Sequence, residues 1–248
     1  MKEFFFKILV SFFKLLIKII DKFFSFFNYK FLYFRIIDKL KEEYTVINLN
    51  NKDIKFFTPS YISRWRASNI YSKEPETIQW IKNFDTKNNK IIFWDIGANV
   101  GIFSIYAACY HETIQIYAHE PNFKNLSLLS KNISINNFQN NIYINQMPLG
   151  ENSLKLDTFF EGDDTEGGAN SSFKKLVNHS TNNYKIIGTN INYLLNKEIF
   201  EYPNYIKIDI DGLEDLVLNS ADKALNYSEL KSILIETDLS NKSTYNSV

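Results

Sequence analysis

The chain has 248 residues, 45% of them apolar and 23% charged, a balance that excludes a wholly disordered chain and a polytopic membrane protein. Basic and acidic residues are equal in number, 28 of each, so no overall positive field attracts nucleic acid, and we expect no nucleic-acid partner. The single cysteine, Cys109, excludes an intrachain disulfide and favours a reducing compartment, the cytoplasm.

The first segment, residues 1–37, is apolar and locally basic. It carries seven basic and two acidic residues, a net charge of +5, which leaves −5 for the rest of the chain. Lys7, Lys14, Lys18 and Lys22 recur at helical spacing among Phe, Leu and Ile, which predicts a basic amphipathic helix. The lysines interrupt each apolar stretch before it reaches the roughly 20 residues of a membrane span.

This helix has two interpretations. Its aromatic side chains could enter a membrane interface while its lysines contact anionic head groups, which would make residues 1–37 a peripheral anchor at the inner face of a membrane. Alternatively, the helix docks on its own domain or on a partner, with the lysine stems covering apolar surface. The sequence leaves both open.

Residues 38–90 are predicted to form a cap or lead-in region. Alternating residues over Tyr44–Phe57 predict a hairpin with its turn at Asn50–Asp53. A helix is expected to start near Glu74 and Pro75, with its apolar stripe at Ile78, Trp80, Ile81 and Phe84. The polar residues of this region either contact a substrate or lie on a solvated surface: Arg64, Arg66, Tyr71 and Glu74.

Residues 91–248 alternate between strand and helix patterns. The predicted strands are IIFWDIG, TIQIYAHEP, NIYINQMPLG, YIKIDIDG and LKSILIETD. The predicted helices cover Val100–Tyr110, Phe123–Asn136 and LEDLVLNSADKAL. This order predicts a doubly wound parallel sheet. The Gly-, Asp- and Ser-rich segment Phe160–Ser172 predicts a loop, either a mobile flap or a long surface turn.

The turn after the first of these strands contains Asp95, Gly97, Asn99 and Gly101. Glycines there allow backbone to approach a ligand, and asparagine tolerates left-handed conformations. The Asp95 carboxylate would repel a pyrophosphate and suits an ammonium group, so we expect a positively charged cofactor. Glu120 ends the next strand 25 residues later, near the spacing of about 20 at which a carboxylate accepts hydrogen bonds from a ribose.

These motifs resemble the FkbM-type methyltransferases, class I enzymes that use S-adenosylmethionine, mostly to methylate hydroxyl oxygens of sugars or small molecules. The resemblance rests on WDIGANVGIFS, AHEPNFKNLSLLSKNISIN, MPLG, YIKIDIDGLEDLVL and ILIET. It implies a Rossmann-like sheet, S-adenosylmethionine as cofactor, and a small-molecule or saccharide acceptor. It also implies that Asp95, Gly97, Asn99 and Gly101 form the methionine-side loop and that Glu120 binds the ribose.

The segment KIDIDGLE supplies the candidate catalytic residues. The family typically has K-I-D-V-E-G-x-E here, so Asp211 replaces a glutamate, while Glu214 matches. Strand alternation places Lys207, Asp209 and Asp211 on one face beside the expected cleft. Asp209 is the candidate base or orienting group, and Lys207 either keeps it ionised or stabilises the developing alkoxide. The alternative is a structural ion pair that closes the turn.

Neither the histidines nor the carboxylates predict a metal ion. His119 adjoins Glu120, but strand alternation points its ring away from the ligand, so we expect a packed histidine. His111 and His179 have no metal-ligand spacing, which argues against zinc. A hard cation held by Asp209 and Asp211 is an alternative that chance pairing of carboxylates disfavours.

The chain is short at its C-terminal end for this fold. Such domains usually continue past the fifth strand into an antiparallel pair, but about ten residues follow Asp238. We therefore expect the final antiparallel strands to be absent and the exposed edge to favour a homodimer.

Three functions remain. The leading one is methylation of a hydroxyl oxygen on a saccharide or related metabolite, as in glycan modification. The second is a catalytically inactive, membrane-associated binding or scaffold protein with a truncated methyltransferase fold. The third, an NAD-dependent oxidoreductase, is disfavoured by Asp95 and by Asn99 in the loop's second-glycine position.

Overall fold

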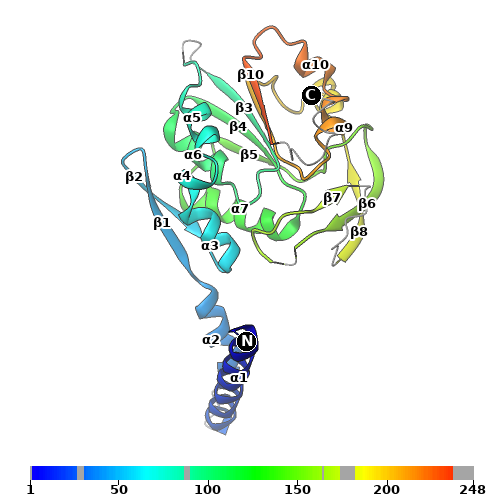
Figure 1. Ribbon diagram of the computed structural model, residues 1–248. Helices are drawn as coiled ribbons and strands as arrows, with labels where there is room; N and C mark the ends of the chain where they lie inside the picture. Colours follow the sequence, from blue (N-terminus) through cyan, green and yellow to red (C-terminus); the bar gives the residue numbers. More distant parts are fainter. Residues whose placement is uncertain (1, 27–30, 87–89, 164, 174–181, 237–248) are drawn as a thin grey trace. The chain divides into compact units, whose positions relative to one another are not determined.

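The computed structural model describes residues 2–26, 31–86, 90–163, 165–173 and 182–236 (Figure 1). The chain divides into two compact units, Met1–Glu43 and Tyr44–Val248. Residues 44–90 of the predicted lead-in region therefore belong to the same unit as the α/β domain, and the three-part division by function stays a prediction. The short-tail prediction concerns residues after Glu236, which lie outside the described part of the chain, as does His179.

The first unit contains two helices, α1 (Lys2–Phe26) and α2 (Leu32–Lys41), where the sequence predicted one helical segment. The second helix begins after Phe31, whose φ of 65° is left-handed. The Tyr33 amide donates a 2.9 Å hydrogen bond to the Asp21 carboxylate, which ties the two helices together. Among the described residues, no helix is both long and apolar enough to cross a membrane.

The centre of the second unit is a five-stranded parallel sheet with the order β10-β9-β3-β4-β5. Its strands in chain order are β3 (Ile91–Ile96), β4 (Ile114–His119), β5 (Ile142–Asn145), β9 (Tyr205–Ile208) and β10 (Ser232–Ile235). The chain first adds β4 and β5 on one side of β3, and it later adds β9 and β10 on the other side. This confirms the predicted doubly wound fold.

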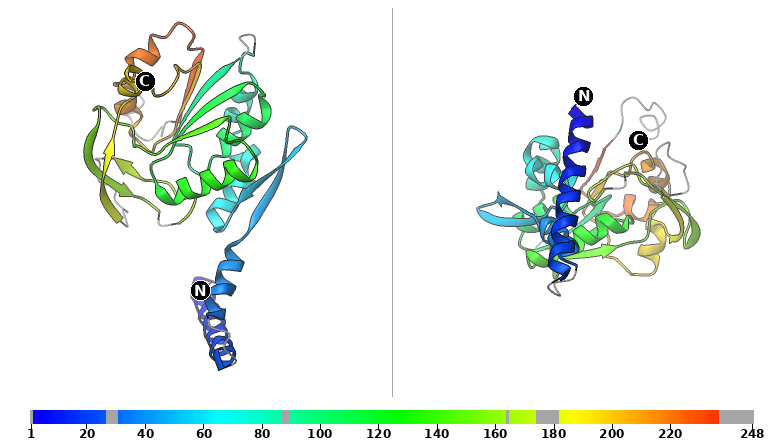
Figure 2. Two further views of the ribbon diagram at one scale, coloured as in Figure 1. Left: turned by 180° about the vertical axis from the view of Figure 1, so that it is seen from behind. Right: turned by 90° about the horizontal axis from the view of Figure 1, so that it is seen from below.

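Helices cover both faces of this sheet (Figures 1 and 2). On one face lie α5 (Pro75–Lys82), α6 (Ile102–Tyr110) and α7 (Phe123–Ile135). On the other lie α8 (Ile191–Asn196), α9 (Glu214–Leu218) and α10 (Asp222–Leu225). Strand β3 is buried on both faces: Phe93 packs into the first core, and Trp94 packs into the second. Continuous burial explains why IIFWDI is wholly apolar up to Asp95.

The lead-in region packs on the first face. It contains the antiparallel hairpin β1 (Tyr44–Leu49) and β2 (Lys52–Phe57), followed by α3 (Tyr61–Ser68) and α4 (Ile70–Lys73). Asn50 and Asn51 form the hairpin turn with φ of 50° and 61°, the conformation that asparagine tolerates best among residues with side chains. Leu49 and Phe56 join the first core. The predicted hairpin is present over Tyr44–Phe57, but its turn is shorter than predicted, because Lys52 and Asp53 belong to β2.

The second unit also contains a small antiparallel sheet with the order β7-β6-β8. The sequence patterns did not predict this sheet. Its strands are β6 (Lys155–Glu161), β7 (Ser172–Phe173) and β8 (Asn182–Gly188). The segment Phe160–Ser172 is thus a loop only between its ends, because Phe160 and Ser172 pair with each other as strand residues. Phe159 and Phe173 form a third core cluster with Leu213.

Candidate active site

A cavity of about 280 Å³ opens at the carboxyl ends of the parallel strands. Residues that follow β3, β4, β5, β9 and β10 all line it, and the small sheet contributes Phe159 and Phe173. The order of strands reverses at β3, so the cavity lies at the topological switch point, where ligands of doubly wound folds bind.

The turn after β3 forms one wall of the cavity. Gly97 and Asn99 line it, with φ of 85° and 53°. A Cβ atom at Gly97 would collide with the backbone carbonyl of Asp209, so only glycine allows the turns after β3 and β9 to approach this closely. Gly101, with φ of 85°, instead begins α6 and faces Leu129 of α7. It supports the turn and is not part of the cavity lining.

Asp95 lies beneath this turn and not in the cavity lining. It is 1% exposed and accepts a 2.6 Å hydrogen bond from the Ser104 hydroxyl, while its Oδ1 atom has no partner among the described residues. Burial raises the pKa of Asp95, and the positive charge of Lys207 opposes this rise.

Glu120 follows β4 and is 6% exposed in the cavity wall. Its two carboxylate oxygens accept hydrogen bonds of 2.8 Å from the backbone amides of Asn99 and Asn122. Burial raises the pKa of Glu120 to about 7, although the two amides favour the ionised form. Each oxygen keeps a further lone pair with which it can accept a hydrogen bond from a ligand hydroxyl.

His119 borders the cavity, but its ring belongs to the core. The ring centroid lies 5.1 Å from that of Trp94, and Nδ1 lies 2.8 Å from the amide nitrogen of Asn145. Burial lowers the pKa of His119 to about 3. A neutral, packed imidazole of this kind is a poor proton acceptor near pH 7.

Lys207 and Asp209 form a buried ion pair at the end of β9. Lys207 is 1% exposed, and its Nζ atom lies 2.7 Å from Asp209 Oδ2 and 5.1 Å from the ring centroid of Phe103. Burial alone would raise the pKa of Asp209, but the charge and hydrogen bond of Lys207 hold it below its ordinary value. Asp209 lines the cavity and is ionised there.

The other two acidic residues of the KIDIDGLE segment, Asp211 and Glu214, accept hydrogen bonds from nearby backbone amides. Asp211, with φ of 56°, accepts a 2.6 Å hydrogen bond from the Asn170 amide. Glu214 accepts a 3.0 Å hydrogen bond from the Gly212 amide at the start of α9. Asp211 lines the cavity, and its hydrogen bond joins the turn after β9 to the loop between β6 and β7.

The described residues of the loop between β6 and β7 help to line the cavity and accept hydrogen bonds from several elements. Arg66 of α3 donates a 2.6 Å hydrogen bond from Nε to the Gly167 carbonyl. The side-chain amides of Asn99 and Asn125 donate to the Gly168 carbonyl at 2.8 and 3.1 Å. Asn99 therefore connects the turn after β3 directly to the loop between β6 and β7.

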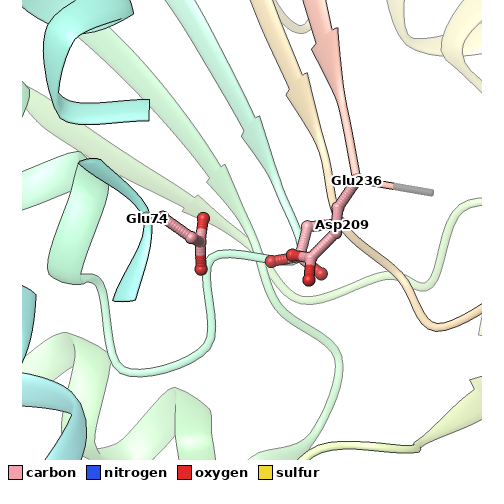
Figure 3. Close-up of side chains that lie close together, drawn as sticks. All are labelled: Glu74, Asp209 and Glu236. Carbon is pink, nitrogen blue, oxygen red and sulfur yellow. The ribbon is translucent and has the colours of Figure 1, made fainter. Parts of the chain in front are cut away.

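Two carboxylates that the sequence did not place beside Asp209 lie next to it (Figure 3). Glu74 precedes α5, and Glu236 follows β10. One oxygen from each of Glu74, Asp209 and Glu236 lies within 4.8 Å of the other two. That spacing would admit a metal ion, but Lys73 pairs with Glu74 and Lys207 pairs with Asp209. Because lysines already neutralise two of the three, we assign no metal ion here.

Comparison with known families identifies the chain. The family model described as the methyltransferase FkbM domain matches residues 95–243, which is more than half of the sequence. The chain belongs to the FkbM methyltransferase family. Its cofactor is S-adenosylmethionine, as the sequence resemblance implied. Among curated protein sequences, none matches the chain significantly.

Solved structures similar to this FkbM methyltransferase have low identity to it. A precorrin-6Y C5,15-methyltransferase from Geobacter metallireducens is 15% identical, with a TM-score of 0.42 over 70% of this chain and 66% of that one. An S-adenosylmethionine-dependent methyltransferase from Agrobacterium tumefaciens is 9% identical, with a TM-score of 0.47 over 83% and 56%. This chain spans less than two thirds of the length of each. The family assignment rests on the sequence match.

The lining residues of this FkbM methyltransferase's cavity suit S-adenosylmethionine in charge and chemistry. Carboxylates outnumber cations among its lining residues: Glu120, Asp209, Asp211 and Glu236 against Arg66 and Lys73. A negative surplus suits a ligand that carries a sulfonium and an ammonium group. The free lone pairs of Glu120 suit ribose hydroxyls.

Proposed function

We propose that this FkbM methyltransferase transfers the methyl group of S-adenosylmethionine to a hydroxyl oxygen of a saccharide or related metabolite. When bound, the cofactor supplies an electrophilic methyl group on a sulfonium. The observation that supports this proposal best is the ionised Asp209, which borders the cavity within contact of the Gly97 turn. A carboxylate in that place suits an acceptor that must lose a proton as it is methylated.

Each predicted site residue has a distinct role in this proposal. Gly97 and Asn99 approach the methionine part of the cofactor, and Glu120 accepts hydrogen bonds from the ribose. Asp95 supports the turn after β3 through its buried charge, and Gly101 supports it by packing against Leu129. Asp209 orients the acceptor hydroxyl and takes its proton, and Lys207 keeps Asp209 ionised.

We expect Asp209→Asn to bind S-adenosylhomocysteine normally and to lose methyl transfer by about 100-fold to 10,000-fold, the range typical of a lost general base. Calorimetry measures the binding. Incorporation of radiolabelled methyl groups into extracts of the source cell measures transfer and leads to the labelled product. Asp53→Asn, an exposed change in the hairpin, is the control. Full turnover of Asp209→Asn with normal binding would show that Asp209 is not catalytic.

We also propose that α1 binds the cytoplasmic face of a membrane peripherally. The helix buries none of its side chains within its unit, and Phe5, Phe12 and Phe23 are 70%, 59% and 62% exposed. At 100° per residue, Lys7, Lys14, Lys18 and Lys22 fall within about 80° of arc, and apolar side chains cover most of the rest. Such a helix suits an interface with anionic lipid, where each lysine contributes about 1 kcal/mol.

Vesicle co-sedimentation tests this anchor. We expect the full chain to pellet with vesicles rich in phosphatidylserine. The variant with all four lysines of this face changed to glutamine should bind about 1,000-fold more weakly, because four contributions of about 1 kcal/mol are lost. A chain without residues 1–37 should stay in the supernatant. Equal binding of all three proteins would rule out the anchor. Homodimer formation stays a prediction for analytical ultracentrifugation.

A further inference from the structure

Asp209 and Glu236 are neighbours because their strands are neighbours. Strands β9 and β10 pair in parallel with Ile208 opposite Ile235. The residues that follow the two strands, Asp209 and Glu236, therefore lie side by side at the same edge of the sheet. The Glu236 amide continues the pairing with a 3.0 Å hydrogen bond to the Ile208 carbonyl. The two carboxyl groups point toward each other and hydrogen-bond (Figure 3).

The two members of this carboxyl pair have different surroundings. Asp209 faces inward, and its side chain is 25% exposed and paired with Lys207 of β9. Glu236 is exposed at the rim of the same cavity. The charged groups that face the pair from the neighbouring helical segment are Glu74 and Lys73, which also pair with each other. Glu236 therefore connects the inner carboxylate with solvent.

Asp209 alone is a weak base for a hydroxyl group. The ammonium of Lys207 at 2.7 Å favours its ionised form, so its pKa lies below the ordinary value and far from neutral pH. A general base works best when its pKa is near the working pH. A second carboxyl group that shares the incoming proton brings the pKa of the base closer to the working pH.

We propose that Asp209 and Glu236 act together as one base, so that the proton leaving the acceptor hydroxyl is shared between their carboxylates. This inference rests on the proposed methyl transfer. The acceptor O–H bond breaks as the bond from its oxygen to the methyl carbon forms. The carbon–sulfur bond of the donor breaks, its electron pair stays on sulfur, and the proton passes to the carboxyl pair. Glu236 then releases the proton to solvent.

The titration of Glu236 agrees with this geometry. Partial desolvation at the cavity rim raises the pKa of Glu236, and the charge and hydrogen bond of Asp209 and the charge of Glu74 raise it further. Lys73 opposes them, and the pKa is about 7. Because the two groups interact strongly, this value belongs to the pair. Below pH 7 the pair holds one proton, and above pH 7 it is empty and can accept the proton of the acceptor.

The pH dependence of methyl transfer into cell extract tests the inference. At saturating S-adenosylmethionine, where titration of Glu120 no longer limits cofactor binding, we expect the wild-type rate to rise with a midpoint near pH 7. In Glu236→Gln that rise should disappear between pH 6 and 8, and the rate at pH 8 should fall about 10-fold to 100-fold. Glu112→Gln, a change at an exposed glutamate outside the cavity, should match the wild type. An unchanged midpoint in Glu236→Gln would overturn the inference, since a merely structural role leaves the midpoint in place.

Carbon-13 titration of the full chain, labelled at its carboxyl groups, gives a readout without turnover. Two carboxyl signals should titrate near pH 7 in the wild type, one from Glu120 and one from the pair, and the signal that Glu120→Gln retains should disappear in both Asp209→Asn and Glu236→Gln. Persistence of that signal in both variants, or its absence from the wild type, would overturn the carboxyl pair. Failure of the wild type to bind S-adenosylhomocysteine in calorimetry would instead overturn the proposed function, and the shared base with it.

Discussion

The Glu120→Ala variant is expected to bind S-adenosylhomocysteine about 100-fold more weakly than the wild type. The change removes the carboxylate proposed to accept hydrogen bonds from the ribose, and each such bond to a charged group contributes about 1.5–3 kcal/mol. It also releases the Asn99 amide, which the carboxylate holds at 2.8 Å, so the turn after β3 loses a support. Isothermal titration calorimetry measures the dissociation constant.

Two variants separate ribose recognition from support of the turn. Glu120→Gln keeps one carbonyl oxygen, so its loss of affinity should be smaller than that of Glu120→Ala. Glu112→Ala, which removes an exposed glutamate elsewhere, should bind like the wild type. If Glu120→Ala folds and binds with wild-type affinity, the ribose assignment is wrong.

Lys207→Met is expected to lower the free energy of unfolding by about 3–5 kcal/mol, the usual effect of removing one partner from a buried ion pair. Lys207 is the counter-charge of both Asp95 and Asp209, and Asp95 is 1% exposed with one oxygen unpaired among the described residues. Methionine fills much of the volume of lysine but leaves Asp95 and Asp209 without the charge of Lys207. Urea denaturation followed by tryptophan fluorescence measures the change.

The matched control is an ion pair of the same kind on the surface. Lys90 lies 2.6 Å from Glu201, and the two side chains are 50% and 51% exposed, so Lys90→Met should cost no more than about 1 kcal/mol. Adding Asp209→Asn to Lys207→Met should restore part of the lost stability, because it removes one uncompensated buried charge. Equal losses for Lys207→Met and Lys90→Met would contradict the buried pair.

Much of the site was predictable from local patterns. The apolar run before Asp95 and the glycines after it indicated a buried strand and a tight turn, and Gly97 and Asn99 do have positive φ. Glu120 was singled out because it ends the next strand near the spacing of a ribose-binding carboxylate. These inferences needed only nearby residues and the known geometry of strand and turn.

Other features depend on contacts between distant segments. Strands β6 and β8 stabilise each other across the small sheet, but both have exposed apolar residues, such as Leu156 and Ile187, so neither shows a clear alternation of buried apolar and exposed polar residues. The approach of Glu74 to Glu236 likewise depends on how α5 and β10 pack around Asp209. Asp95 was expected beside the ligand, but it is buried, and Ser104 in the first turn of the following helix donates a hydrogen bond to it.

Calorimetry of the full-length wild-type chain with S-adenosylmethionine, S-adenosylhomocysteine and NAD tests the central claim most directly. We expect the first two to bind one site per chain, to compete with each other and to weaken together in Glu120→Ala, while NAD gives no heat of binding. Binding of NAD alone would indicate an oxidoreductase. Binding of none of the three would indicate an inactive scaffold, and either result would contradict the methyltransferase site described above.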